Sequence, residues 1–100
     1  MSNDELARFF EGAKRHAAKE AATSRALAHE MIEHAERELA NTRRSPVARA
    51  LAIGEYLAEA WNIANAAKYS DVEKTYAAVR ALRKRAKRVL ERESAPQRRG

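Results

Sequence analysis

The chain has 100 residues and a formal net charge of +6, and it contains no Cys. The lack of Cys excludes a disulfide framework, a thiolate nucleophile and every Cys-ligated zinc site. No stretch approaches the ~18 consecutive uncharged apolar residues of a membrane-spanning helix, and the charged N-terminal segment has no apolar signal-peptide core. We therefore expect a soluble, cytoplasmic protein without a membrane partner.

The composition indicates an all-α protein with a thin core. A chain of this length corresponds to one domain, which we expect to comprise residues 1–93. Of the 45 apolar residues 23 are Ala, and only 3 Gly and 2 Pro occur, which is typical of long helices. The small number of larger apolar side chains predicts a marginally stable monomer that gains stability from a partner.

The first predicted helix covers residues 3–41. Ser2 and Glu5 have the spacing of a capping box, which satisfies two backbone N–H groups at a helix start. Apolar residues then recur at helical spacing, with bulky side chains near both ends of the segment and only Ala in its middle. The stripe consists of Leu6, Phe10, Ala13, Ala17, Ala21, Ala28, Met31, Ala35 and Leu39.

We favour one continuous helix, straight or bent near Thr23, although the region around Thr23 leaves two architectures open. A helix that breaks there would give four helices of comparable length and a closed four-helix bundle. A continuous helix, straight or bent, would be about 58 Å long and would extend roughly 20 Å or more beyond a hairpin of the two later helices. Apolar side chains would then lie uncovered at one end, which predicts a homodimer or a complex with another helical protein.

Ser45 and Pro46 predict the start of a second helix, over residues 46–68. Ser is a strong N-cap, and Pro is best tolerated at the first helical position. Gly54 and Ala58 form a notch of small residues that would permit close helix contact, and Asn65 is expected on the same face. The expected buried face comprises Val47, Ala50, Leu51, Ile53, Gly54, Leu57, Ala58, Ala60, Trp61 and Ala64.

Ser70 and Glu73 repeat the capping-box spacing and predict a third helix over residues 71–93. Because the second and third helices match in length and are joined by a short turn, we expect an antiparallel hairpin on which the first helix packs as a three- or four-helix bundle. Residues 94–100 are expected to form a disordered basic tail. The apolar stripe of the third helix is Val72, Tyr76, Val79, Leu82, Ala86, Val89 and Leu90.

Charge is distributed unevenly along the chain. Residues 1–79 carry 11 Lys and Arg against 12 Asp and Glu, whereas residues 80–100 carry 9 against 2. Helical spacing predicts a cationic ridge on the face of the third helix opposite its apolar stripe. This cationic ridge comprises Arg80, Lys84, Lys87 and Arg88, with Arg83, Arg85 and Arg92 at its flanks and Arg98 and Arg99 in the tail.

The cationic ridge predicts a polyanion-binding surface, because Lys and Arg replace the condensed counterions of a nucleic acid. The helix dipole and ordinary solvation explain a few cations near a helix C-terminus, but they do not explain nine Lys and Arg against two acidic residues. Two long antiparallel helices fit a helix-turn-helix motif poorly, and an apolar face without Trp or Phe fits a membrane surface poorly. No aromatic residue is expected beside the ridge, so contact with the phosphate backbone should dominate, with little sequence preference.

Two His residues invite a metal-site hypothesis. His29 and His34 lie five residues apart, about 140° around a helix, so they cannot bind one ion together. His29 with Glu33, or Glu30 with His34, could each supply two ligands, but the further ligands that a metal centre needs are missing. We expect ordinary surface ion pairs in this segment, and no metal or other cofactor.

No pattern in the sequence predicts catalysis. The chain has no Gly-rich phosphate loop, no nucleophile beside a base and no carboxylate pair in an apolar setting. Apolar residues outside the predicted core point to protein contacts instead. Phe9 and Phe10 lie near one end of the first helix, and Tyr56 and Ile63 form a second, exposed stripe on the second helix.

Two functions are compatible with these patterns. The first is a non-catalytic component of a nucleic-acid or nucleoprotein complex, which docks its basic C-terminal helix on phosphates. The alternative is a protein-interaction module, such as an adaptor, inhibitor or assembly factor. In that case the cations would meet an acidic protein surface, and the aromatic residues would anchor the complex.

Overall fold

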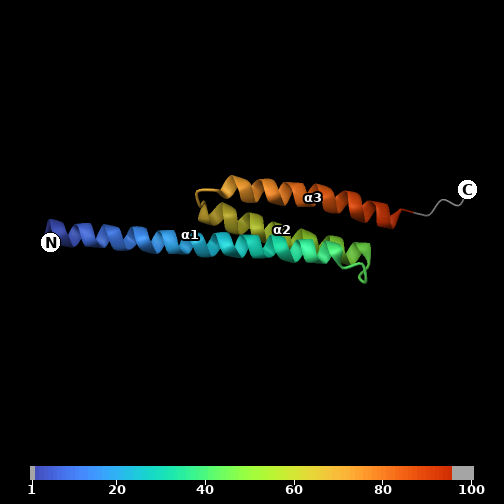
Figure 1. Cartoon of the computed structure of the whole chain (residues 1–100), viewed down its shortest axis with the longest axis horizontal. Helices are drawn as coiled ribbons and strands as arrows, with labels where there is room; N and C mark the ends of the chain where they lie inside the picture. The colour runs from blue at the N-terminus through green and yellow to red at the C-terminus, as the bar shows by residue number, and fades with distance from the viewer. Residues whose placement is uncertain (1, 96–100) are drawn as a thin grey trace, which may run out of the picture.

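Three helices make up almost all of the described chain. The structure is a computed structural model and describes residues 2–95. Helix α1 spans Asn3–Ala40, α2 spans Pro46–Ala67 and α3 spans Val72–Ser94, and no strand occurs between residues 2 and 95. Helices α2 and α3 form an antiparallel hairpin, and α1 runs alongside α2 (Figure 1). The predicted all-α fold with a long N-terminal helix is confirmed.

Helix α1 starts as predicted and does not break. The Ser2 side chain accepts a hydrogen bond from the Glu5 backbone N–H, and the Glu5 carboxylate accepts one from Ser2, which completes the capping box. At Thr23 the helix continues, because the hydroxyl donates to the Lys19 carbonyl at 3.0 Å without displacing the backbone hydrogen bonds. The four-helix alternative therefore does not form.

The N-terminal half of α1 lies outside the hairpin. Every residue from 2 to 20 is exposed, and the first buried residue is Ala28. Residues 3–20, called the overhang below, extend past the turn between α2 and α3 (Figure 1). The molecule consequently measures 83 × 21 × 14 Å and has a radius of gyration of 19.8 Å, where about 13 Å is usual for 100 residues. The end of α1 that the hairpin leaves uncovered is thus the N-terminal end, which carries Leu6, Phe9 and Phe10.

The predicted start of α2 is confirmed, whereas the predicted start of α3 is wrong. Ser45 caps α2 by accepting from the Ala48 N–H, and Pro46 occupies the first position, as predicted. Helix α3, however, begins at Val72, and the capping box predicted for Ser70 and Glu73 is wrong: the N-cap is Asp71, without a side-chain cap bond. The Asp71 carboxylate instead pairs with Arg25 of α1 at 2.7 Å.

The ends of the hairpin also differ slightly from the prediction. Helix α2 ends at Ala67 because Lys68 adopts the left-handed conformation, with φ 49°, and its N–H bonds to the Ala64 carbonyl at 2.9 Å. Helix α3 reaches Ser94, which had been assigned to a disordered tail. The rest of that predicted tail, residues 96–100, lies outside the described residues.

The core is a thin cluster between the three helices. Helix α1 contributes only the segment from Ala28 onward, and its apolar positions Leu6, Phe10, Ala13 and Ala17 remain exposed. Ala fills many positions where helices approach closely, which limits the apolar area that folding removes from water. The buried cluster comprises Ala28, Ile32, Ala35, Leu39, Ile53, Leu57, Ala60, Val79, Leu82, Ala86 and Leu90.

The buried face of α2 is rotated from the predicted one. Val47 and Leu51 are 70% and 66% exposed, and Ala50, Ala58 and Asn65 are exposed as well. The predicted notch at Gly54 is wrong, since a Cβ added there would meet no atom within 4 Å. The reason is that α1 packs on the side of α2 that carries Tyr56 and Ile63, which turns the opposite side away from the core.

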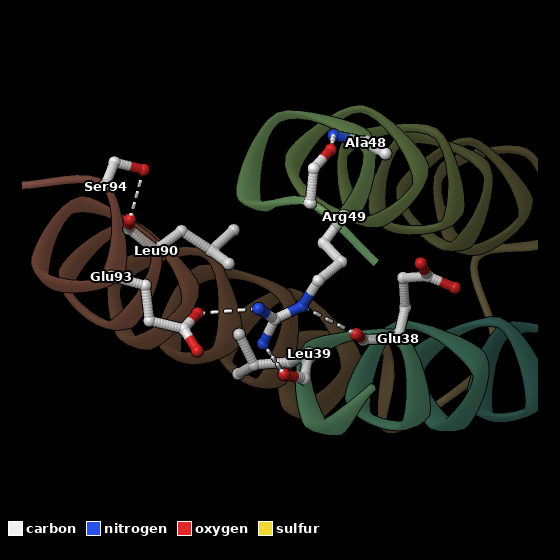
Figure 2. A network of polar contacts seen from close by, with 8 residues as sticks. Glu38, Leu39, Ala48, Arg49, Leu90, Glu93 and Ser94 are labelled. Atoms are coloured by element: carbon white, nitrogen blue, oxygen red, sulfur yellow. Dashed lines mark hydrogen bonds and ion pairs between the residues drawn. The ribbon is translucent and has the colours of Figure 1, made fainter. Parts of the chain in front are cut away.

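A buried arginine joins the three helices at one end of the bundle. Arg49 of α2 is 2% exposed, and its Nε donates to the Glu38 carbonyl at 3.3 Å, while Nη2 donates to the Leu39 carbonyl. Its Nη1 donates to the Glu93 carboxylate of α3 at 2.6 Å (Figure 2). The guanidinium thus satisfies backbone carbonyls at the C-terminus of α1, where the helix dipole favours a cation, and binds α3 at the same time.

Replacing Arg49 by Met should lower the free energy of unfolding by about 2–4 kcal/mol, because three charge-assisted hydrogen bonds are lost and two carbonyls lose their donor. Urea unfolding followed by circular dichroism measures this change. Arg44→Met is the matched control. Arg44 pairs with the Glu38 side chain but is 47% exposed, so its loss should cost less than about 1 kcal/mol. Equal losses in the two variants would contradict a structural role specific to Arg49.

Candidate polyanion interface

The cationic ridge lies on the exposed side of α3. The periodicity that buries Val79, Leu82 and Ala86 necessarily turns the intervening positions outward. All the predicted ridge and flank residues are exposed, which places the cations along the outer surface of the hairpin. They are Arg80, Arg83, Lys84, Arg85, Lys87, Arg88 and Arg92.

Carboxylates do not neutralise this surface. Within residues 2–95, none of the salt bridges involves a cation between positions 80 and 92. The acidic residues of α1 that form ion pairs do so with other cations, as Glu38 does with Arg44. Glu93, one of two acidic residues in the C-terminal 21, is held by Arg49. The like charges of α3 therefore face solvent together and create a positive surface potential.

An aromatic pair lies at the N-terminal end of the ridge. The rings of Trp61 and Tyr76 are 4.2 Å apart between centroids, and the Arg80 guanidinium lies 5.9 Å from the centre of the Trp61 ring. The Tyr76 hydroxyl donates to the Asn65 side-chain oxygen at 3.3 Å. The sequence reasoning missed this cluster, because it assigned Trp61 to the core. The i,i+4 spacing of Tyr76 and Arg80 was the available signal, whereas Trp61 and Asn65 come from α2.

An apolar groove runs beside the ridge between α2 and α3. This α2–α3 groove has a volume of about 560 Å³, and its walls come only from α2, α3 and Ala95. Arg83 and Lys87 line its α3 side together with Glu91. The groove was not predicted, because its α2 wall was assigned to the buried face. Its apolar lining includes Val47, Ala50, Gly54, Leu57, Ala86 and Leu90.

The predicted protein-contact residues divide into two groups. Phe9 and Phe10 are 67% and 58% exposed, and their rings meet edge to face at 5.9 Å between centroids. Tyr56 and Ile63 were expected to form an exposed stripe, and this expectation is wrong: both are half-buried against the core. Tyr56 also stacks on His34 of α1, at 5.3 Å between ring centroids. Packing by α1 leaves little of either side chain for a partner.

The two His residues occupy different environments. His34 lies between Tyr56 and Glu30, whose carboxylate oxygen is 3.8 Å from His34 Nε2, whereas His29 is exposed. No group of three or more His, Asp or Glu side chains suited to a metal ion occurs between residues 2 and 95. Over the same range no helix combines the length and apolar character that a membrane crossing requires.

No model of a known protein family matches the chain, and no curated protein or solved structure matches it either.

Removing cations from the ridge should not destabilise the fold. In Lys84→Gln/Arg88→Gln, repulsion between like charges at i,i+4 spacing is relieved, so the free energy of unfolding should rise by about 0.5 kcal/mol at low salt. The gain should vanish near about 0.5 M NaCl, where charges are screened. Urea unfolding at the two salt concentrations measures both values. A loss above about 1 kcal/mol would reveal stabilising ion pairs and contradict the exposed, unpaired ridge.

Proposed function

We propose that this protein is a non-catalytic helical binding protein that docks α3 on a polyanion, most readily the phosphate backbone of a nucleic acid. The observation that carries the proposal is the absence of carboxylate partners for the ridge and its flanks within the described residues. Cations that no protein group neutralises are available to release counterions from phosphates, which is the main source of non-specific affinity.

The positions of the cations along α3 favour this proposal over a helix-dipole effect. Interaction with the dipole is confined to the last turn, which accounts for Arg92. The four ridge residues lie one to four turns earlier, in the middle of the helix. From Arg80 to Arg92 the axis advances by about 18 Å, which matches the spacing of roughly five phosphates along one DNA strand.

The remaining surface of α3 is suited to backbone contact. Ala77, Ala78 and Ala81 are exposed, and such small side chains let a helix approach a phosphate chain closely. Between Val72 and Ser94 the helix has no Asn or Gln, the residues that read adenine by paired hydrogen bonds. We therefore expect little sequence preference, with phosphate contacts providing most of the affinity.

Two observations favour the alternative, an interaction module for an acidic protein. The α2–α3 groove is apolar and bordered by Arg83 and Lys87, and the overhang exposes Phe9 and Phe10. An acidic amphipathic helix could fill such a groove. A pull-down that retains its partner after nuclease treatment would favour this alternative, whereas loss of the partner would favour nucleic acid.

The proposal includes self-association. The chain exposes 7808 Å², about 2000 Å² more than the roughly 5700 Å² usual for a compact protein of 11.2 kDa. This surplus is as large as the area that a standard protein interface buries in total. A homodimer would remove the apolar part of the surplus from water.

Neutralising the cationic ridge should abolish binding to a labelled duplex of about 20 base pairs at physiological salt. In this variant Arg80, Lys84, Lys87 and Arg88 are replaced by Gln. For the wild-type protein the plot of log affinity against log salt should have a slope of about −0.9 for each phosphate neutralised, and this slope should become shallower in the variant. Fluorescence anisotropy over a salt series measures both quantities.

A matched control separates the ridge from net charge. It changes two other Arg and two other Lys to Gln, all of them exposed and outside α3, so that both variants fall from +6 to +2. The control residues are Arg8, Lys14, Lys19 and Arg43. The control should retain a steep salt dependence and most of the affinity. Equal weakening in both variants would show that overall charge, and not α3, attracts the duplex.

A further inference from the structure

The α2–α3 groove lies on a face of the hairpin that α1 does not cover. No residue of α1 contributes to its walls, and the adjacent Leu51 and Val47 are largely exposed. Apolar grooves between two helices are filled by a third helix in closed bundles. The overhang offers such a helix, because residues 3–20 are helical, exposed and apolar along one face.

The overhang and the groove match in length and in apolar character. From Leu6 to Ala17 the overhang presents its apolar stripe over about 16 Å, and residues 46–57 of the groove wall cover the same distance. The first turn of the overhang is acidic, with Asp4 and Glu5, whereas the overhang as a whole carries four acidic residues against four Lys and Arg. The α3 side of the groove carries Arg83 and Lys87 against Glu91, for a net charge of +1.

A chain cannot place its own overhang in its own groove while α1 stays helical. The overhang lies beyond the turn between α2 and α3, whereas the groove is at the other end of the hairpin, next to the start of α2 (Figure 1). Helix α1 is continuous between these two ends, because it has no break from Asn3 to Ala40. The matching segment must therefore come from another molecule.

We propose that the overhang of a second copy of this chain occupies the α2–α3 groove, and that the two copies exchange overhangs reciprocally. Two antiparallel copies related by a twofold axis place each overhang beside the partner's groove, which gives the isologous contact typical of homodimers. Leu6, Phe9 and Phe10 anchor the helix in the groove, and its first turn lies near the start of the partner's α2 and the end of its α3. The proposal rests on the self-association proposed above and is independent of polyanion binding.

The exchange leaves the outer part of the ridge available. Arg83 and Lys87 face the groove, whereas Lys84 and Arg88 do not contribute to its walls and lie on the outer face of α3. A dimer formed in this way therefore carries two outward cationic surfaces. Lys84→Gln/Arg88→Gln therefore weakens binding of a polyanion without touching the groove, and Phe10→Gln weakens the exchange without touching α3.

Sedimentation equilibrium on two variants tests the exchange. Val47→Glu places a carboxylate in the apolar groove, beside the acidic first turn of the partner's overhang, yet it suits the first turn of α2, where a negative charge is favourable. Phe10→Gln removes an apolar anchor from the overhang. Each should raise the dimer dissociation constant by about tenfold or more, because burial of a side chain of this size contributes at least that factor.

Two control substitutions should leave the dissociation constant within about twofold of the wild-type value. Asn62→Glu adds the same charge to an exposed position of α2 outside the groove, and Leu27→Gln removes an exposed apolar side chain of α1 outside the overhang. Circular dichroism checks that all four variants keep their helices.

Paramagnetic relaxation locates the contact directly. Since the chain has no Cys, Ala7→Cys provides one site for a nitroxide label. In a mixture of labelled and ¹⁵N-labelled copies, the amide signals of Val47, Gly54 and Ser94 should broaden. A monomer at about 100 μM would overturn both the exchange and the self-association. If the Val47→Glu and Phe10→Gln variants still dimerise as the wild type does, or if the label broadens the amide signals of other residues instead, the exchange is overturned and the self-association stands.

Discussion

The buried guanidinium of Arg49 is the interaction on which the arrangement of this protein depends. It binds the last carbonyls of α1 and the Glu93 carboxylate of α3 from its position on α2, and so fixes one end of all three helices. At the other end of the hairpin, Arg25 and Asp71 join α1 to the start of α3. These two contacts set where α1 lies along the hairpin, and everything before residue 21 is left beyond it.

The same constraint explains the charge of the surface. The C-terminal 21 residues contain only two acidic residues, and Arg49 engages one of them, so the cations of α3 find no carboxylate among the described residues of the hairpin. A thin core, in which four of the eleven clustered residues are Ala, contributes modest apolar burial, and it does not cover the groove and the overhang as well. One fold therefore produces a cationic outer surface for a polyanion and two apolar surfaces, which we infer to complement each other between copies.

Local patterns were sufficient to predict the helices but not their packing. The caps at Ser2 and Ser45 depend on neighbouring residues alone, so the helix starts there were predicted correctly. The capping box predicted at Ser70 and Glu73 does not form, because Asp71 becomes the N-cap and its carboxylate pairs with Arg25, which is distant in sequence. The overhang followed from the lengths of the helices. The rotation of α2 could not be predicted, because it depends on which side of α2 packs against α1. This packing accounts for the incorrect predictions of a buried Gly54 and an exposed Tyr56.

The candidate site shows the same division. Helical periodicity alone placed the ridge cations outward, and the structure agrees. Arg49 shares its face with Ile53 and Leu57 at i+4 and i+8, so periodicity already pointed it toward the core, but its partners lie 10, 11 and 44 residues away. The α2–α3 groove could not be predicted, since its two walls come from helices whose relative rotation no local pattern encodes.

The central claim is that Arg49 is sequestered with Glu93 and the cations of α3 are not paired. An NMR spectrum of the ¹⁵Nε–H groups of arginine, recorded without and with a short duplex, tests it most directly. We predict one protected Nε–H signal, from Arg49, that does not shift on addition of the duplex, together with rapidly exchanging signals from Arg80 and Arg88 that do shift. Protected signals from Arg80 and Arg88 in the free protein, or rapid exchange at Arg49, would contradict the claim.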